Sequence, residues 1–217
     1  MSDREQILNR VRAALVDVSD SDPQTDTPIT WQYGKPLAMD DVVDVLRDRV
    51  EDYRAGFVVT SPAEVGSAIV DALHQTGAGN VVLPPGLDAD WCKAITDAGF
   101  TVLSDEPPLD RLTLNTVDAV VTASAVAIAD TGTVVLDHGP DQGRRALSLL
   151  PDRHVCVVRS DQVVSDVPEG VARLDEAIRA GRPLTWISGG SATSDIELTR
   201  VEGVHGPRHL TVIVVQS

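Results

Sequence analysis

The chain has 217 residues, 42% of them hydrophobic, so it is long enough to bury roughly 70% of its unfolded surface as one large domain. Eighteen basic residues face 33 acidic ones, and the formal net charge of −15 argues against nucleic acid as a partner, because it repels phosphate backbones. No apolar run approaches the ~20 residues of a membrane span, and the first residues do not resemble a secretory signal. We therefore expect a soluble, cytoplasmic protein.

Two features of the composition point to the surroundings of the protein. Lys35 and Lys93 are the only lysines, and Asp is about three times as frequent as Glu. This acidic surface is consistent with ordinary solvation, and it also suggests adaptation to a salty cytoplasm, where screening weakens self-repulsion. Cys92 and Cys156 lie far apart in apolar contexts, so we expect core residues in a reducing compartment and no metal or iron–sulfur cofactor held by this chain.

The N-terminal part, residues 1–36, reads as a helical arm. Ser2 and Glu5 form a capping-box pattern, and apolar residues from Ile7 to Leu15 have helical spacing. Residues 17–36 are rich in Asp, Ser, Thr and Pro, which is typical of an acidic linker. The apolar stripe of the helix needs a cover, either the main domain over 37–217 or a partner subunit.

From residue 40 to residue 103, helices and strands alternate. Helices are expected over about 40–54, 62–76 and 88–98, and strands over 57–60, 81–84 and 100–103. Short links between alternating elements predict a parallel sheet with helices packed on it. This part of the chain therefore indicates an α/β fold.

In the middle of the chain the alternation of helices and strands stops. Strands are expected over 118–122, 125–129 and 133–136, and the short link Asp130–Gly132 permits a hairpin but no helical crossover, so the sheet becomes mixed or a second sheet begins. Helices over about 143–150 and 168–180, with strands over 154–158 and 210–215, complete the pattern. The fold class is α/β, with a mixed, mostly parallel sheet flanked by helices.

Common cofactor motifs are missing, because the chain has no G-x-G-x-x-G after a strand, no Walker A sequence and no G-x-S-x-G. One positive candidate is the segment Asp130-Thr131-Gly132-Thr133. It is either a tight hairpin turn or a functional site, in which the Asp130 carboxylate and the threonine hydroxyls bind substrate and Asp130 acts as nucleophile or base. Another is Arg144-Arg145, which beside a Gly-rich turn suggests an anion clamp, or two surface arginines paired with aspartates.

The most distinctive stretch is Ser188 to Arg208. An apolar run over 184–187 leads into a turn rich in small and hydroxylated residues, and Ser194 with Glu197 predicts the start of a helix. Such a loop forms either a helix cap alone or a backbone nest for a phosphate or carboxylate. His205 is a candidate acid/base or a structural histidine. The candidate ligand-binding residues in this stretch are Ser188, Gly189, Gly190, Ser191, Thr193, Ser194, Asp195, Glu197 and Arg208.

Several ordered motifs together resemble one family. They are V-T-A-S-A-V-A-I-A-D-T-G-T-V-V-L over 121–136, R-A-L-S-L-L-P-D-R-H-V-C-V-V over 145–158, I-S-G-G-S-A-T-S-D-I-E over 187–197 and G-V-H-G-P-R over 203–208. This pattern resembles the LUD-domain family over roughly residues 40–217. The chain departs from the family's usual residues at Asp130 (usually Glu), Gly190 (commonly Pro) and Ala192 (commonly Arg).

The resemblance implies a fold like that of glucosamine-6-phosphate deaminase, ribose-5-phosphate isomerase and the CoA transferases. It also implies a role in oxidising L-lactate to pyruvate, with the iron–sulfur clusters held by an iron–sulfur partner subunit and a further cysteine-rich subunit. Under this hypothesis the chain is a non-redox subunit that binds a small anionic ligand. The alternatives are a stand-alone isomerase or CoA-transferase-like enzyme acting on a phosphorylated or CoA-linked substrate, and a ligand sensor without turnover.

Overall fold

The computed structural model describes residues 2–18, 35–194, 200–203 and 205–216, and the chain divides into two units, residues 1–35 and 36–217. The first unit contains helix α1 (Asp3–Ala14). Its expected capping box is present, because the Ser2 hydroxyl accepts from the Glu5 backbone N–H and the Glu5 carboxylate accepts from the Ser2 N–H. Most of the predicted linker lies outside the described residues. No helix in the described ranges is long and apolar enough to cross a membrane.

The second unit is built on a six-stranded sheet in which every strand pair is parallel. In spatial order its strands are β1 (Gly56–Thr60), β12 (His209–Val215), β7 (Arg153–Arg159), β4 (Ala119–Thr122), β2 (Asn80–Leu83) and β3 (Thr101–Ser104). Val212 lies between Phe57 and Cys156 in the register, so β12 is a central strand. Its mostly buried, apolar sequence fits that position.

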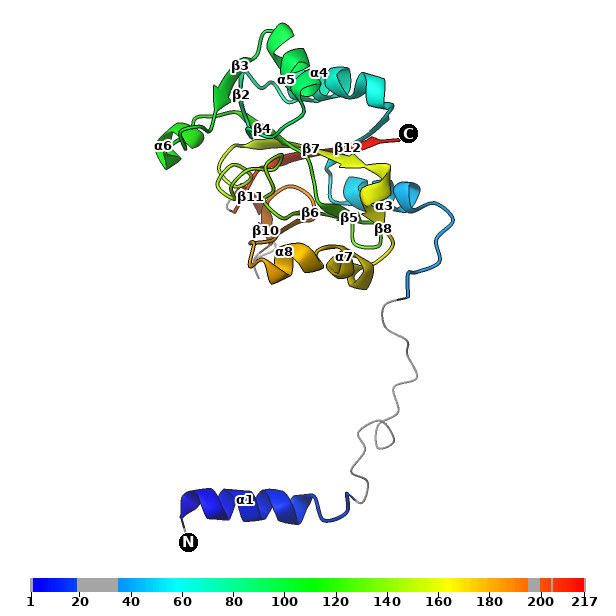
Figure 1. Cartoon of the computed structure of the whole chain (residues 1–217), viewed down its shortest axis with the longest axis vertical. Coiled ribbons are helices and arrows are strands. Elements are labelled where there is room, and N and C mark those ends of the chain that lie inside the picture. Colours follow the sequence, from blue (N-terminus) through cyan, green and yellow to red (C-terminus); the bar gives the residue numbers. More distant parts are fainter. Residues whose placement is uncertain (1, 19–34, 195–199, 204, 217) are drawn as a thin grey trace. The chain divides into compact units, whose positions relative to one another are not determined.

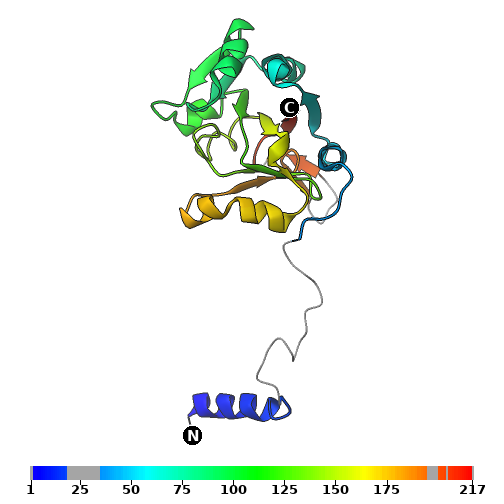
Figure 2. The same cartoon turned by 45° about the vertical axis from the view of Figure 1, so that its right-hand side comes forward.

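Helices α4 (Val65–Gln75) and α5 (Ala89–Asp97) cover one face of this sheet (Figures 1 and 2). The 3-10 turn η1 (Pro62–Glu64) precedes α4. The buried positions Val65, Ile69 and Leu73 follow helical spacing and pack on the apolar residues of the strands. The alternation of helix and strand predicted for this part of the chain is confirmed.

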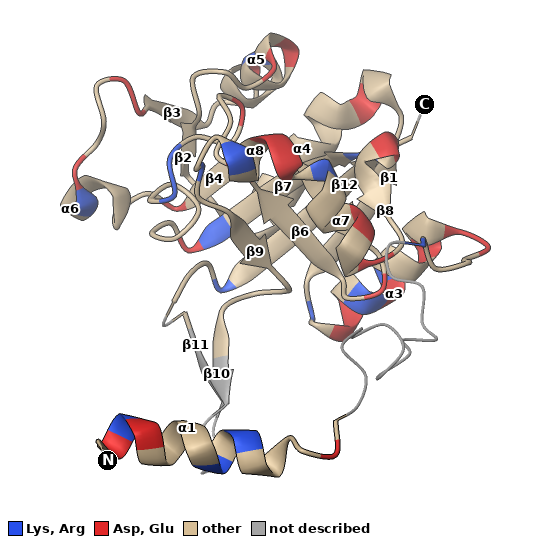
Figure 3. Ribbon diagram, turned by 60° about the horizontal axis from the view of Figure 1, so that its bottom comes forward, with Lys and Arg blue, Asp and Glu red and all other residues tan. Residues whose placement is uncertain are grey.

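The other face is covered by α3 (Val42–Asp52) and a separate sheet. This second sheet has the order β8 (Val163–Val164), β5 (Val126–Ile128), β6 (Thr133–Leu136) and β9 (Thr185–Ile187), and it contains the predicted hairpin. Its outer side packs on α7 (Val167–Arg173), where Gly170 lies against Ile128, and α8 (Asp175–Arg179) follows (Figure 1). The strands are mostly uncharged, and charged residues lie mainly on helices and loops (Figure 3). The predicted α/β class is confirmed, with the mixed pairing confined to the second sheet.

Two local predictions are wrong. Residues 143–150 form consecutive turns instead of a helix, because Pro151 follows and the segment is too short to be stable as a helix in isolation. The helix predicted over 168–180 is interrupted at Leu174, which separates α7 from α8. Ser194 ends strand β10 (Ala192–Ser194), which pairs in antiparallel fashion with β11 (Arg200–Glu202), and the helix start predicted after it falls on residues 195–199, outside the described residues. A short helix, α6 (Arg111–Leu114), was not predicted.

Candidate functional site

A cavity of about 250 Å³ lies where the amino ends of β7 and β12 meet the second sheet. Its lining combines hydroxyl groups, glycine backbone and two imidazoles with apolar side chains: Ser148, Leu149, His154, Thr185, Trp186, Ile187, Ser188, Gly189, Gly190, Ser191, Ala192, His205, Gly206, Pro207 and Leu210. None of these residues carries a carboxylate, a lysine or an arginine. The cavity is therefore suited to a small molecule held by hydrogen bonds.

The loop from Ser188 to Ser191 forms one wall of this cavity. Gly189 has φ +81°, and a Cβ there would lie 2.5 Å from the Tyr53 Cβ; a Cβ on Gly190 would lie 2.2 Å from the Arg208 carbonyl oxygen. Glycine is therefore required for this close approach. Within the described residues, the backbone N–H groups of Gly189 and Gly190 donate no hydrogen bond, so they are free to bind an anion.

The loop is fixed by its neighbours along the chain. The Ser191 N–H donates to the Pro207 carbonyl at 2.7 Å, and the His205 N–H donates to the Ser191 hydroxyl at 3.0 Å. These bonds hold Pro207 and the exposed His205 beside the loop from Ser188 to Ser191. The two ends of the stretch singled out from the sequence therefore meet at the cavity.

The β5–β6 hairpin reaches the same loop through hydroxyl groups. The Thr131 and Thr133 hydroxyl oxygens lie 2.8 Å apart, and that of Thr133 lies 2.7 Å from the Ser188 hydroxyl oxygen. Gly132 supplies the expected positive φ (+60°) and lies against the backbone of Arg49. The side chain of Asp130 is exposed, while its carbonyl oxygen accepts a hydrogen bond from Arg49 Nε at 3.2 Å.

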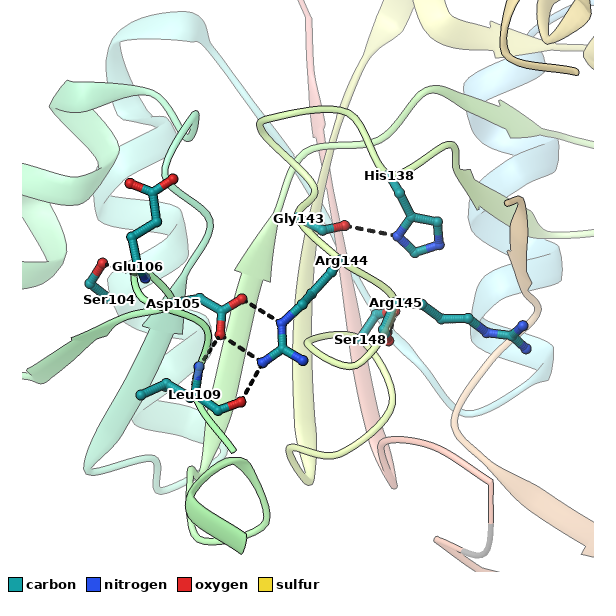
Figure 4. A network of polar contacts seen from close by, with 9 residues as sticks. All are labelled: Ser104, Asp105, Glu106, Leu109, His138, Gly143, Arg144, Arg145 and Ser148. Atoms are coloured by element: carbon teal, nitrogen blue, oxygen red, sulfur yellow. Dashed lines mark hydrogen bonds and ion pairs between the residues drawn. The ribbon is translucent and has the colours of Figure 1, made fainter. Parts of the chain in front are cut away.

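Arg144 and Arg145, which the sequence suggested as an anion clamp, have different roles in the structure. Arg144 donates two hydrogen bonds, at 2.7 and 2.8 Å, to the Asp105 carboxylate and a third to the Leu109 carbonyl (Figure 4). This guanidinium holds the pKa of the Asp105 carboxyl below its usual value. Arg144 therefore fixes the loop after β3 and does not serve as a free anion contact.

Arg145 points away from this pair (Figure 4), is exposed, and makes no ion pair with any described residue. It lines a groove of about 960 Å³ that shares Leu149, His205 and Gly206 with the cavity. Arg208 lines the same groove but is paired with Asp152 at 3.1 Å. Arg145 is thus an unpaired guanidinium beside the cavity, in a protein of strongly negative charge.

His154 is the cavity residue that sequence reasoning missed. Its side chain is 1% exposed, and Nε2 lies 2.8 Å from the Thr122 hydroxyl oxygen. Burial lowers the pKa of His154 to about 4, so the ring is neutral at pH 7. Nδ1 is a buried atom without a hydrogen-bond partner. The available signal was a histidine inside a strand that is otherwise almost entirely apolar.

A second hollow, of about 560 Å³, lies at the carboxyl ends of the central strands and contains Trp91, Asp141 and Arg159. β2 and β4 are neighbours in the sheet, but the chain leaves them in opposite directions: β3 follows β2 on one side, and β7 follows β4 on the other. Such a reversal of strand order is a topological switch point, where ligands commonly bind in α/β proteins. Burial raises the pKa of the Asp141 carboxyl. The sequence alone does not indicate this site, because strand order decides where it forms.

The other candidates of this stretch follow the loop from Ser188 to Ser191 along the chain. Thr193 and Ser194 belong to β10, and Asp195 and Glu197 lie outside the described residues. In the described ranges, no cluster of three or more His, Cys, Asp or Glu side chains is placed to hold a metal ion. Cys156 is buried and Cys92 is partly buried.

Comparison with known proteins gives three findings. A sequence profile of the LUD domain matches residues 38–215. "Lactate utilization protein C" of Deinococcus radiodurans is 54% identical over 180 residues, covering 83% of this chain and 82% of that protein, and its namesake in Geobacillus thermodenitrificans is 28% identical, covering 90% and 87%. The crystal structure of a DUF162 family protein from Deinococcus radiodurans superposes with a TM-score of 0.69 at 48% identity, covering 83% of this chain and 99% of that one.

Proposed function

The chain belongs to the LUD-domain family, and on this basis we propose that it acts in lactate utilization as a non-redox subunit beside iron–sulfur and cysteine-rich partner subunits. The observation that carries the proposal is the 54% identity to a lactate utilization protein C over most of both chains. With two cysteines in the sequence, the chain has too few thiolates for a four-cysteine cluster, which suits a division of labour with cysteine-rich partners.

We further propose that the cavity binds a small carboxylate. The free N–H groups of Gly189 and Gly190 support this, together with the hydroxyls of Ser188 and Ser191, because such donors stabilise a negative charge. Arg145 supplies the positive charge that attracts the anion toward the cavity. A bulky phosphorylated ligand fits this cavity less well than a small acid, because the volume is about 250 Å³.

Deletion of the gene tests the pathway. We expect the deletion strain to stop growing on L-lactate as the sole carbon source and to grow normally on pyruvate, the product that bypasses the oxidation. A plasmid copy of the full chain restores growth on lactate. Unchanged growth of the deletion strain on lactate would overturn the pathway assignment.

Affinity purification tests the partner subunits. We expect a tagged full chain, expressed at its own locus and purified at native salt, to retain a cysteine-rich protein that contains iron and acid-labile sulfide. A tagged chain that restores growth on lactate but retains no such protein would contradict the proposed assembly. The growth test and the purification therefore fail independently.

A further inference from the structure

The second hollow, at the carboxyl ends of the central strands, has an apolar floor. Val65, Val157 and Val215 line it, and each is at most 8% exposed. Trp91, in the first turn of α5, and Asp141 also line the hollow, and both are partly exposed. The hollow therefore combines apolar surface, an indole and a carboxylate at a switch point, where α/β proteins commonly bind ligands.

The loop that carries Asp141 is fixed against the ends of two strands. The Ala123 N–H, directly after β4, donates to the Asp141 carbonyl at 3.1 Å. The Gly86 N–H, after β2, donates to the Pro140 carbonyl at 3.0 Å. A Cβ on Gly86 would lie 2.6 Å from the Pro140 carbonyl carbon, so this close approach requires glycine. Asp141 is therefore held in place before a ligand binds, which reduces the entropic cost of binding.

The other charged groups of the second hollow already have partners. The Asp88 carboxylate accepts two backbone N–H hydrogen bonds at the start of α5. Arg159 and Asp161 pair with each other at 3.3 Å on the exposed rim. Asp141 makes no ion pair with any described residue. Its carboxylate is therefore the charged group of this hollow that can pair with a ligand.

The surroundings of Asp141 favour a cation over an anion. Burial raises the pKa of its carboxyl, and the negative charge of Asp137 adds to this rise. The side chain of Gln142 and the guanidinium of Arg159 oppose the rise. A positive charge in the hollow would stabilise the ionised carboxylate. An anion would instead meet a lining with three aspartates and one arginine, in a protein of net charge −15.

The aromatic residue of the hollow suits the same kind of ligand, because the face of a tryptophan ring attracts cations. We propose that the second hollow binds a small organic cation, in which an ammonium group pairs with Asp141 and the apolar body contacts Trp91 and the buried valines. This ligand is opposite in charge to the carboxylate proposed for the cavity beside the loop from Ser188 to Ser191, and it binds at the opposite ends of the strands. The inference goes beyond the proposed function and does not rest on it.

Two probes that share one ring and differ in charge test the proposal. Benzylamine is a cation at neutral pH, and benzyl alcohol is uncharged. By isothermal titration calorimetry on the full chain at low salt, we expect benzylamine to bind about tenfold more tightly, because its ammonium group forms a charge-assisted hydrogen bond with Asp141. Equal affinities, or no binding of benzylamine at millimolar concentration, would overturn the hollow as a cation site.

Substitution of Asp141 tests the role of its charge. D141N keeps the shape of the side chain, and we expect it to bind benzylamine about tenfold more weakly and benzyl alcohol almost as the wild type does. The matched control is D71N, which removes an exposed carboxylate on α4 outside the hollow. Equal losses in the two variants would show that only the net charge of the protein matters, and they would overturn the pairing with Asp141.

Substitution of Trp91 tests the contribution of the ring. W91L keeps an apolar side chain and removes the aromatic ring, so we expect benzylamine to bind about fivefold more weakly. W91F keeps a ring, and we expect its affinity for benzylamine to stay within about twofold of the wild type. Equal losses in W91L and W91F would overturn the cation–ring contact.

Nuclear magnetic resonance of the wild-type full chain locates the probe. Trp91 lines the second hollow, and Trp186 lines the cavity beside the loop from Ser188 to Ser191, so their indole N–H signals report on different sites. We expect benzylamine to shift the signal of Trp91 and to leave that of Trp186 unchanged. A shift of Trp186 alone would place the cation in the other cavity and overturn the proposal. The growth test on the deletion strain reports on the pathway whatever the outcome here.

Discussion

The hydroxyl oxygen of Thr133 lies 2.7 Å from that of Ser188, and this contact joins the β5–β6 hairpin to the loop that forms the cavity wall. The two residues are 55 positions apart in the chain. They come together because β6 and β9 pair in antiparallel fashion, with Val134 opposite Ile187. The hairpin therefore contacts the loop from Ser188 to Ser191 through Thr133, whereas the side chain of Asp130 is exposed.

Removing this contact should cost stability. T133V replaces a buried hydroxyl with a methyl group, and we expect T133V and S188A each to lower the free energy of unfolding by about 1 kcal/mol in urea titrations. Because the two groups bond to each other, the double variant should lose less than the sum of the single losses. Strictly additive losses would show that the contact contributes no coupling energy.

Arg145 should affect ligand affinity without affecting stability. R145A removes an unpaired guanidinium beside the cavity, and we expect it to weaken L-lactate binding roughly threefold to tenfold at low salt, with a smaller effect at high salt because charges are screened. The matched control is R111A, which removes an exposed arginine on α6. Equal effects of the two variants would mean that Arg145 contributes only to net charge.

Arg144 should affect stability, because it is paired with the buried Asp105. R144A leaves the Asp105 carboxylate, which is 7% exposed, without its main partner, so we expect a loss of about 2–3 kcal/mol in the free energy of unfolding. The control is R179A, whose ion pair with Asp175 is exposed and should be worth less than about 1 kcal/mol. A loss in R144A no larger than that in R179A would contradict a structural role for the buried pair.

The buried imidazole of His154 should make stability depend on pH. Its pKa is about 4 in the folded protein and about 6.5 in an unfolded chain, so the unfolded state binds the proton first as the pH falls. Stability from this group is complete above pH 6.5 and declines toward pH 4, by about 3 kcal/mol. We expect the difference in unfolding free energy between wild type and H154Q to change across this window and to remain constant above it.

The acidic surface predicts a response to salt. If the low lysine and high aspartate content is an adaptation to a salty cytoplasm, the melting temperature should rise between low and molar potassium chloride, because screening reduces self-repulsion among the excess carboxylates. Differential scanning calorimetry at several salt concentrations measures this. A melting temperature that stays flat or falls would indicate an ordinary solvated surface.

The elements that local sequence determines were predicted well. The spacing of Val65, Ile69 and Leu73 specifies α4 without further information, and the apolar run of β12 specifies a strand buried on both faces. Short segments were predicted poorly, because contacts distant in sequence decide their conformation. Residues 143–150 have a helical pattern but form turns, anchored by the bonds of Arg144 to Asp105 and Leu109.

The sequence indicates only part of the candidate site, because contacts between residues distant in sequence decide the rest. The small residues from Ser188 to Ser191 indicate a binding loop by their composition alone. Which arginine remains free for a ligand depends on Asp105, 39 residues before Arg144, and no local pattern shows that pairing. The burial of His154 depends on Leu210, its neighbour on β12, and on a second sheet that the sequence left as one of two possibilities.

The position of β12 also has a consequence for synthesis on the ribosome. β12 lies between β1 and β7, so the first strand of the sheet has no place to pair until the last strand has been made. A nascent chain that ends before residue 209 holds β1 and α3 apart from the rest of the sheet, with apolar surface uncovered. Folding of this domain should therefore finish only after β12 has left the ribosome, and until then the nascent chain depends on protection from aggregation.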